Sequence, residues 1–303
     1  MCMIGGFAGC GQADTPSQNI MKAVAEENRE AKGTSKADNQ AQTEGISVLD
    51  TEESAQPELT GTVTVAGSTS MEKFANALAE SFMIKYPGVT VTVEFTGSSA
   101  GIESVIAGRA DIGNSSRNLT DDEKSLGAVE NVAAIDGIAI ITDISNITTT
   151  LTTEQLAGIY TGEIRNWNEV CGNDQAIVVV GRESGSGTRD AFEELLEIED
   201  VCAYANELDS TGAVKARVAL TPGAIGYVST DVLDHTILTI SLDGIEPTEE
   251  NIRAGSYLLG RPFIMVTNGE ISAQSKEVQG MFEYLKSEEG QELIRAVGLV
   301  VPN

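Results

Sequence analysis

The sequence predicts an α/β fold with mostly parallel sheets, because strand-like and helix-like segments alternate along most of the chain. A second observation is a repeated unit, in which a β-rich run ends in a Gly/Ser/Thr loop and an amphipathic helix pattern follows at once. A third is the continuous apolar run 132–142, which is typical of a strand buried on both faces of a sheet.

The repeated unit occurs three times, with its loops at 67–70, 96–101 and 181–188. Each helix start presents unpaired backbone N–H groups and a partial positive charge. Hydroxyl side chains add donors, and glycine lets the backbone approach a ligand closely. Ligands of such sheets bind where strands end and helices begin, so we expect the loops to converge on one oxyanion. Plain helix capping is the alternative, and it is sufficient for one loop rather than for three.

The individual elements are predicted from hydrophobic periodicity and from helix start and stop signals. Strands are expected at 62–66, 89–95, 110–113, 132–142, 177–180, 222–228 (after a turn), 257–259 and 262–266. Helices are expected to begin near residues 71, 102, 120, 152, 189, 214, 275 and 292. The folded region should therefore begin near residue 59.

Composition narrows the function. The net charge of −27 over 303 residues argues against nucleic acid as a partner, which would need basic patches. No run after residue 58 approaches the roughly 20 apolar residues of a membrane span. A single histidine, His235, and the lack of a Cys-x-x-Cys pair predict no metal site, and no cofactor is expected.

The N-terminal residues are interpreted as a targeting segment. Phe7-Ala8-Gly9-Cys10 resembles a bacterial lipobox, so residues 1–10 are read as the remnant of a signal peptide with Cys10 as the lipidated residue. An ordinary small-residue tail is the alternative. Residues 11–58 are rich in polar and acidic residues and poor in core formers, which predicts a flexible acidic linker.

The loop 181–188 matches none of three motifs that are typical of enzymes. A P-loop would need a lysine and a different glycine spacing, and a dinucleotide fingerprint would need a third glycine. A Gly-x-Ser-x-Gly nucleophile would need glycine where Ser184 stands. His235 would have to be the general base, and nothing in the surrounding sequence indicates such a role. The loop therefore favours binding over catalysis.

The chain resembles the phosphate-binding proteins of bacterial phosphate ABC transporters over nearly all of residues 59–303. The stretches that carry the resemblance are 66–70 (AGSTS), 96–102 (TGSSAGI), 110–117 (ADIGNSSR), 162–167 (GEIRNW), 182–189 (RESGSGTR) and 222–228 (PGAIGYV). The segment with Gly-Ser-Gly-Thr and its upstream arginine is the most specific of them.

This resemblance implies a two-lobed periplasmic-binding-protein-like fold of type II, with hinge strands between the lobes. One lobe would comprise 59–136 plus 246–303, and the other 137–245. The implied phosphate ligands are Thr69, Ser70, Ser98, Arg182, Ser186, Gly187 and Thr188. Ser116 and Arg117 complete the predicted set, although some members of the family have an aspartate at the position of Ser116 and an acid at that of Ser184.

The missing aspartate bears on selectivity, because a carboxylate accepts the proton of phosphate and rejects fully ionised sulfate. We hypothesise that the acceptor has moved to Asp136 or Glu183 and that Arg117 adds positive charge. Cys171 and Cys202 are a possible disulfide outside the cell, with two separate thiols as the alternative.

The expected function is a monomeric, lipid-anchored phosphate receptor on the extracellular face of a Gram-positive-type cell membrane. It would deliver inorganic phosphate to an ABC permease without making or breaking a bond. A receptor for another oxyanion, sulfate or molybdate, is the alternative. Two further alternatives are a hydrolase that acts on phosphate esters and a surface protein that kept the fold but lost the transport function.

Overall fold

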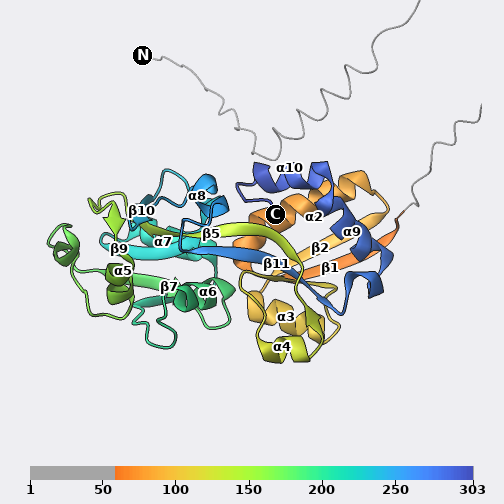
Figure 1. Ribbon diagram of the computed structural model, residues 1–303, viewed down its shortest axis with the longest axis horizontal. Coiled ribbons are helices and arrows are strands. Elements are labelled where there is room, and N and C mark those ends of the chain that lie inside the picture. The colour runs from red at the N-terminus through yellow and green to blue at the C-terminus, as the bar shows by residue number, and fades with distance from the viewer. Residues whose placement is uncertain (1–58, 303) are drawn as a thin grey trace, which may run out of the picture. The chain divides into compact units, whose positions relative to one another are not determined.

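The computed structural model describes residues 59–302 of the chain (Figure 1). The predicted lipobox at Cys10 and the whole of the predicted linker 11–58 lie outside the described residues. No helix among residues 59–302 is both long and apolar enough to span a membrane. Within the same residues, no group of three or more His, Cys, Asp or Glu side chains is arranged to hold a metal ion.

Strands and helices alternate through most of the described chain, as expected for an α/β protein. The strands are β1 (Gly61–Gly67), β2 (Val89–Phe95), β3 (Ile112–Ser115), β4 (Ala128–Val129), β5 (Val132–Thr142), β6 (Thr150–Leu151), β7 (Val178–Arg182), β8 (Asn206–Leu208), β9 (Ala224–Ser229), β10 (Leu238–Leu242) and β11 (Gly260–Asn268). The α-helices are α2 (Glu72–Lys85), α3 (Ser98–Ile106), α4 (Asp121–Ser125), α5 (Thr153–Tyr160), α6 (Gly187–Leu195), α7 (Thr211–Leu220), α8 (Glu249–Arg253), α9 (Lys276–Lys286) and α10 (Glu288–Ala296). Short 3₁₀ helices are η1 (Thr69–Met71), η2 (Trp167–Val170), η3 (Thr230–Val232) and η4 (Ile271–Ala273).

One mixed sheet runs through the described residues in the order β2-β1-β3-β11-β5-β9-β7-β8. The outer strands pair in parallel, β1 with β2 and β3, and β7 with β8 and β9. The two long central strands, β5 and β11, run antiparallel to each other and to their other neighbours (Figure 1). The sheet is therefore parallel on both sides and antiparallel in the middle, rather than mostly parallel throughout.

Two hydrophobic cores lie on the two sides of this central pair. The first core is built by β1, β2, β3, α2, α9 and α10, and α3 covers the other face of this part of the sheet. The second is built by β7, β9, β10, α5 and α6, with α7 covering the other face. β5 belongs to both, since Ala134 packs in the first core and Ile138 in the second. The first-core side is the part of the fold that contains β1, β2, β3, α2, α3, α9 and α10, and the second-core side is the part that contains β7, β9, β10, α5, α6 and α7.

The central strands are buried on both faces, as the apolar run predicted. Ile138 and Ile140 of β5 pack against one set of helices, whereas Ala139 and Ile141 pack against the other. Successive side chains of a strand point to opposite faces, so a strand covered on both sides is apolar at nearly all of its positions. The bounds predicted for this strand and for 89–95 match β5 and β2.

One predicted strand is absent from the structure, and the strands β4, β6, β8 and β10 were not predicted. The segment 257–259 was predicted as a strand, but it forms a turn that leads into β11. Tyr257 and Leu259 are buried there while Leu258 is exposed, and the Tyr257 hydroxyl donates to the Ile138 carbonyl at 2.8 Å. A turn packed against β5 thus reproduces the alternation of a strand. β8 was not predicted, because its three residues include the exposed Glu207 and form no β-rich run.

Candidate functional site

Four strand–loop–helix units place their loops together, one more than the sequence predicted. The strands β1, β2, β7 and β8 are followed by η1, α3, α6 and α7, respectively. β1 is parallel to β2, and β7 is parallel to β8, so each pair delivers two neighbouring loops at the same edge. The first pair belongs to the first-core side and the second pair to the second-core side.

Seven hydroxyl side chains from these loops and from the end of β3 meet at one point, and we call them the hydroxyl cluster. The first-core side supplies Ser68, Thr69, Ser70, Ser98 and Ser116, and the second-core side supplies Thr188 and Thr211; all seven residues are buried. Buried hydroxyls normally have hydrogen-bond partners, and here the partners are other members of the cluster.

The cluster joins the two sides. Ser70 Oγ lies 2.6 Å from Thr188 Oγ1 and 2.7 Å from Thr211 Oγ1. The Ser68 hydroxyl donates to Ser116 Oγ at 2.8 Å, and Ser116 Oγ lies 3.4 Å from Thr188 Oγ1. Residues separated by more than a hundred positions therefore lie within hydrogen-bonding distance of one another.

Glycine is required where α6 begins. A Cβ atom on Gly187 would lie 2.4 Å from Ser98 Oγ and 3.0 Å from Ser116 Oγ, so no larger residue fits without displacing the cluster. Ser98 Oγ in turn accepts the backbone N–H of Ser116 at 3.2 Å. Ser186 is buried beside this point, but its side chain accepts the Arg189 N–H and caps α6. The start of α6 thus faces the cluster with its backbone.

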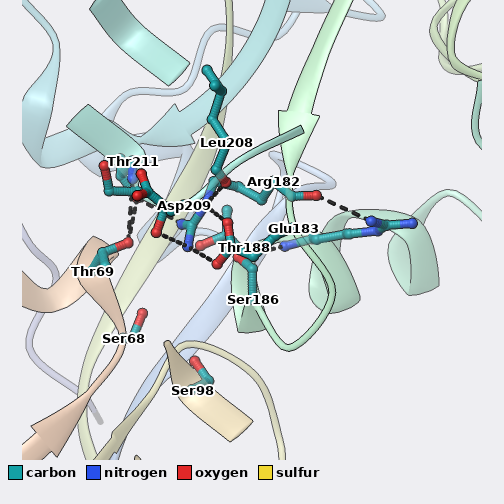
Figure 2. A network of polar contacts seen from close by, with 12 residues as sticks. Ser68, Thr69, Ser98, Arg182, Glu183, Ser186, Thr188, Leu208, Asp209 and Thr211 are labelled. Carbon is teal, nitrogen blue, oxygen red and sulfur yellow. Dashed lines mark hydrogen bonds and ion pairs between the residues drawn. The ribbon is translucent and has the colours of Figure 1, made fainter. Parts of the chain in front are cut away.

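Arg182 presents one nitrogen to the cluster and anchors the others, as Figure 2 shows. Its Nε donates to the Leu208 carbonyl at 3.0 Å, and its Nη2 donates to the Asp209 carbonyl at 3.1 Å and to Glu183 at 2.9 Å. Its Nη1 donates to Thr211 Oγ1 at 3.3 Å. Because the side chain is 2% exposed and its nitrogens are hydrogen bonded, the guanidinium is held in a fixed orientation.

The guanidinium of Arg117 is directed away from the cluster, contrary to the expectation that it adds charge there. It donates to both carboxylate oxygens of Glu123 at 2.8 Å, to Asp190 at 2.9 Å and to Ser99 Oγ at 3.1 Å. The hydrogen bond with Glu123 raises the pKa of Arg117, and the same partner arginine lowers the pKa of Glu123 against the effect of burial. Since Asp190 belongs to α6, this ion pair links the first-core side to the second-core side outside the hydroxyl cluster.

The hypothesis of a relocated carboxylate acceptor is also not supported. Asp136 accepts two hydrogen bonds from Arg261, at 3.0 and 2.8 Å, and others from Ser229 and Thr230. Glu183 pairs with Arg182 instead. Among residues 59–302, no carboxylate oxygen is hydrogen bonded to a hydroxyl of the cluster. The cluster therefore offers hydroxyls, backbone amides and one guanidinium.

Cys171 and Cys202 are free thiols in the structure, so the possible disulfide is not present. Cys171 is exposed in a left-handed turn at the end of η2, whereas Cys202 is half-buried in the second core. Burial raises the pKa of the Cys202 thiol to about 11. Neither cysteine lies in the hydroxyl cluster.

Two members of the cluster were not among the predicted ligands. Ser68 stood in a predicted loop without a role, and Thr211 was missed altogether. The signal for Thr211 was present in Asp209-Ser210-Thr211-Gly212, a fourth polar loop ahead of a helix. The strand before it is short and polar, so the β-rich run that marks the other three units is missing there.

Chemically, the site can bind a small oxyanion but holds no activated nucleophile. A serine or threonine hydroxyl becomes a nucleophile when a neighbouring base takes its proton. In the described part of the chain, the hydrogen-bond partners of the cluster hydroxyls are other hydroxyls, backbone groups and Arg182. Donors from both sides of a two-core α/β fold, gathered around one buried point, define a solute-binding protein for oxyanions.

Comparison with known proteins identifies the family. A family model described as a PBP superfamily domain matches residues 50–289. The phosphate-binding protein PstS of Bacillus subtilis strain 168 is 33% identical over 238 residues, which cover 77% of this chain and 78% of the relative. The chain belongs to the PBP superfamily and, within it, to the family of phosphate-binding proteins named PstS.

Two solved structures agree with this assignment. A protein described as a phosphate ABC transporter substrate-binding protein with bound phosphate, from Clostridium perfringens, is 38% identical with a TM-score of 0.77, covering 80% of this chain and 100% of the other. An ABC-type phosphate transport receptor from Vibrio cholerae is 36% identical with a TM-score of 0.68, covering 79% and 100%. The predicted fold class and family are confirmed, and these relatives are named as binding proteins rather than enzymes.

Proposed function

We propose that this protein is an extracellular receptor that binds inorganic phosphate and delivers it to the permease of an ABC transporter. The observation that carries the proposal is the hydroxyl cluster itself, with Arg182 Nη1 and the starts of α3, α6 and α7 around it. The names of the relatives, which are those of phosphate-binding and phosphate-transport proteins, support the choice of ligand.

The physical requirement for such a site is a dense set of donors. Burying an anion is costly unless its oxygens receive hydrogen bonds that replace those of water. The hydroxyls of the cluster now bond to one another, and an anion at this point would take over those bonds. The positive ends of α6 and α7 and the charge of Arg182 add electrostatic stabilisation that persists inside a strongly acidic protein. The proposed ligands are Thr69, Ser70, Ser98, Ser116, Arg182, Thr188 and the Gly187 amide.

The two sides are proposed to act as lobes that close over the anion. The lobes would be 59–136 plus 246–303 and 137–245, joined by β5 and β11, which contribute to both cores or run between them. The contact of Ser70 with Thr188 and that of Arg117 with Asp190 join residues of different proposed lobes. Binding would therefore stabilise the closed arrangement, since the anion receives donors from both lobes.

Attachment to the cell surface is part of the proposal. Lipidation at Cys10 with a tether over 11–58 would keep a monomeric receptor beside its permease while leaving the folded region free to turn. Attachment of a lipid to Cys10 can be tested directly. Metabolic labelling with a palmitate analogue should mark the wild-type precursor in a bacterial host, and Cys10→Ala should abolish the label.

Calorimetric titration of the full chain with phosphate tests the binding function. We expect saturable binding at one site, and Arg182→Met should weaken it by about 100-fold or more, because a charge-assisted donor is lost from a buried site. Ser272→Ala, an exposed serine on η4, is the matched control and should bind as the wild type does. Wild-type protein that folds but takes up no phosphate would refute the proposal.

A receptor for another oxyanion is the second candidate function. The observation that favours it is that no carboxylate is hydrogen bonded to the hydroxyl cluster in the described residues. Without an acceptor-only group, the site has less reason to reject an anion that carries no proton. Competition titrations with sulfate and molybdate between pH 5 and pH 8 separate the candidates. If either anion binds more tightly than phosphate across this range, that anion replaces phosphate as the ligand.

A further inference from the structure

Thr211 is the member of the cluster that neither the sequence motifs nor the comparisons assign. It is the first residue of α7, a helix of ten residues, and it is 2% exposed. Its position follows from β8, which is parallel to β7 in register Arg182 with Leu208 and ends at the same edge of the sheet. The unit formed by β8 and α7 therefore repeats the geometry of the unit formed by β7 and α6.

The contacts of Thr211 are all made with site residues. Its backbone N–H donates to Thr69 Oγ1 at 3.2 Å, and its Oγ1 lies 2.7 Å from Ser70 Oγ and 3.5 Å from Thr69 Oγ1. Arg182 Nη1 donates to the same Oγ1 at 3.3 Å. Figure 2 shows Thr211 next to Thr69 and Arg182, with which it forms hydrogen bonds. Ser210, not Thr211, caps the helix by accepting the Ala213 N–H.

The hydrogen bond from Arg182 occupies one acceptor position of the Thr211 hydroxyl. A hydroxyl carries one proton and two lone pairs. One lone pair accepts the N–H of Arg182, which cannot itself accept, so the hydroxyl proton is free to point toward Ser70 and the centre of the cluster. An anion at that centre would receive a hydrogen bond from a hydroxyl that Arg182 holds in place through its oxygen.

We propose that Thr211 is a further ligand-binding residue, which donates to the anion from the second-core side and slows its release by also contacting Thr69 and Ser70 of the first-core side. The inference rests on the proposed phosphate-binding function and deepens it. Contacts between the two sides form only when the sides are together, after the anion has reached one of them. Loss of such contacts raises the dissociation rate and leaves the association rate almost unchanged.

The test is stopped-flow measurement of phosphate association and release by the full chain. Thr211→Val keeps the shape of the side chain and removes its hydroxyl. We expect a dissociation rate about 10- to 100-fold faster than wild type, as for loss of a hydrogen bond to a charged group, with an association rate changed less than about threefold. Thr211→Ser keeps the hydroxyl and should restore release to within about threefold of wild type.

Ser210→Ala is the matched control, because it removes the cap of the same helix without removing a hydroxyl of the cluster. It should lower the melting temperature while leaving the release rate within about threefold of wild type. Wild-type release rates in Thr211→Val, or a Thr211→Ser variant as defective as Thr211→Val, would overturn the proposal. Failure of the wild-type chain to bind phosphate would instead refute the proposed function.

Discussion

Ser70 Oγ and Thr188 Oγ1 lie 2.6 Å apart, although 118 positions separate the two residues and each is packed with a different core. Ser70 follows β1 at the start of the first core, and Thr188 lies in the first turn of α6 in the second. Their contact shows that the two sides of the central strand pair meet through polar side chains at this point.

Ser70 and Thr188 should be coupled in ligand binding. Ser70→Ala and Thr188→Val are each expected to weaken phosphate binding by about 10-fold or more, because each removes a donor to a charged group. The double variant should lose less than the product of the two factors, since residues in contact are not additive. Calorimetric titration of the four proteins gives the coupling energy, and strict additivity would speak against a shared ligand.

Gly187→Ala should damage the site more than the fold. The added methyl would lie 2.4 Å from Ser98 Oγ, so the cluster must shift and we expect phosphate affinity to fall at least about 100-fold, with a cost in stability of about 1–3 kcal/mol. Gly212→Ala is the control, because a Cβ there meets nothing within 4 Å. It should be neutral or stabilising by up to about 1 kcal/mol in denaturant titrations. Equal loss of affinity in both variants would contradict the steric explanation.

Asp231 should make folding stability depend on pH. The side chain is 8% exposed and neither carboxylate oxygen has a hydrogen-bond partner; burial, and next the charge of Asp136, raises its pKa to about 7. Lys73 and Arg261 oppose this shift without cancelling it. The folded protein thus holds a proton that the unfolded chain releases near pH 4, so this group's contribution to stability is lost as the pH rises from about 4 to about 7.

Asp231→Asn removes this dependence. We expect the variant to be more stable than wild type by a few kcal/mol at pH 8, roughly as the pKa shift implies, and equal to it near pH 4. Asp234→Asn is a control of opposite sign, because Lys215 lowers the pKa of that exposed carboxyl. Urea titrations at several pH values measure both, and a stability difference for Asp231→Asn that does not change with pH would exclude the explanation.

The buried pair of Asp136 and Arg261 should be essential as a pair. The two side chains are 0% and 1% exposed, and they face each other at one register position of β5 and β11. Arg261→Met leaves Asp136 buried without its cation, and we expect a loss of about 3–5 kcal/mol. Arg261→Met combined with Asp136→Leu should recover part of that loss, because no unpaired charge remains. Thermal or urea unfolding would show this, and a double variant less stable than Arg261→Met would contradict it.

Much of the fold was predictable because it depends on local patterns. The alternation in 89–95 and the apolar run in 132–142 gave two strands with the bounds that the structure has. The loops at 67–70 and 181–188 were recognised from hydroxyl and glycine residues ahead of helix patterns. These features are set by backbone propensity and by burial of one face, both of which are written in neighbouring residues.

The ion-pair partners of the charged side chains were not predictable in the same way. Arg117 was expected at the anion site and instead binds Glu123 and Asp190, whereas Asp136 was considered as an acceptor and instead binds Arg261. A charged group takes the partner that satisfies it best in space, and these partners lie up to 125 positions away. Sequence spacing carries no information about such distances.

By itself, the sequence determined the secondary structure of the long elements, the class of fold and the presence of several anion-facing helix starts. Only the tertiary structure decided which of these starts share one centre, added Thr211 to them and turned Arg117 outward. The physical reason is that a cap or a strand is stabilised by residues a few positions away. A buried polar cluster is instead stabilised by groups that the packing of two separate cores brings together.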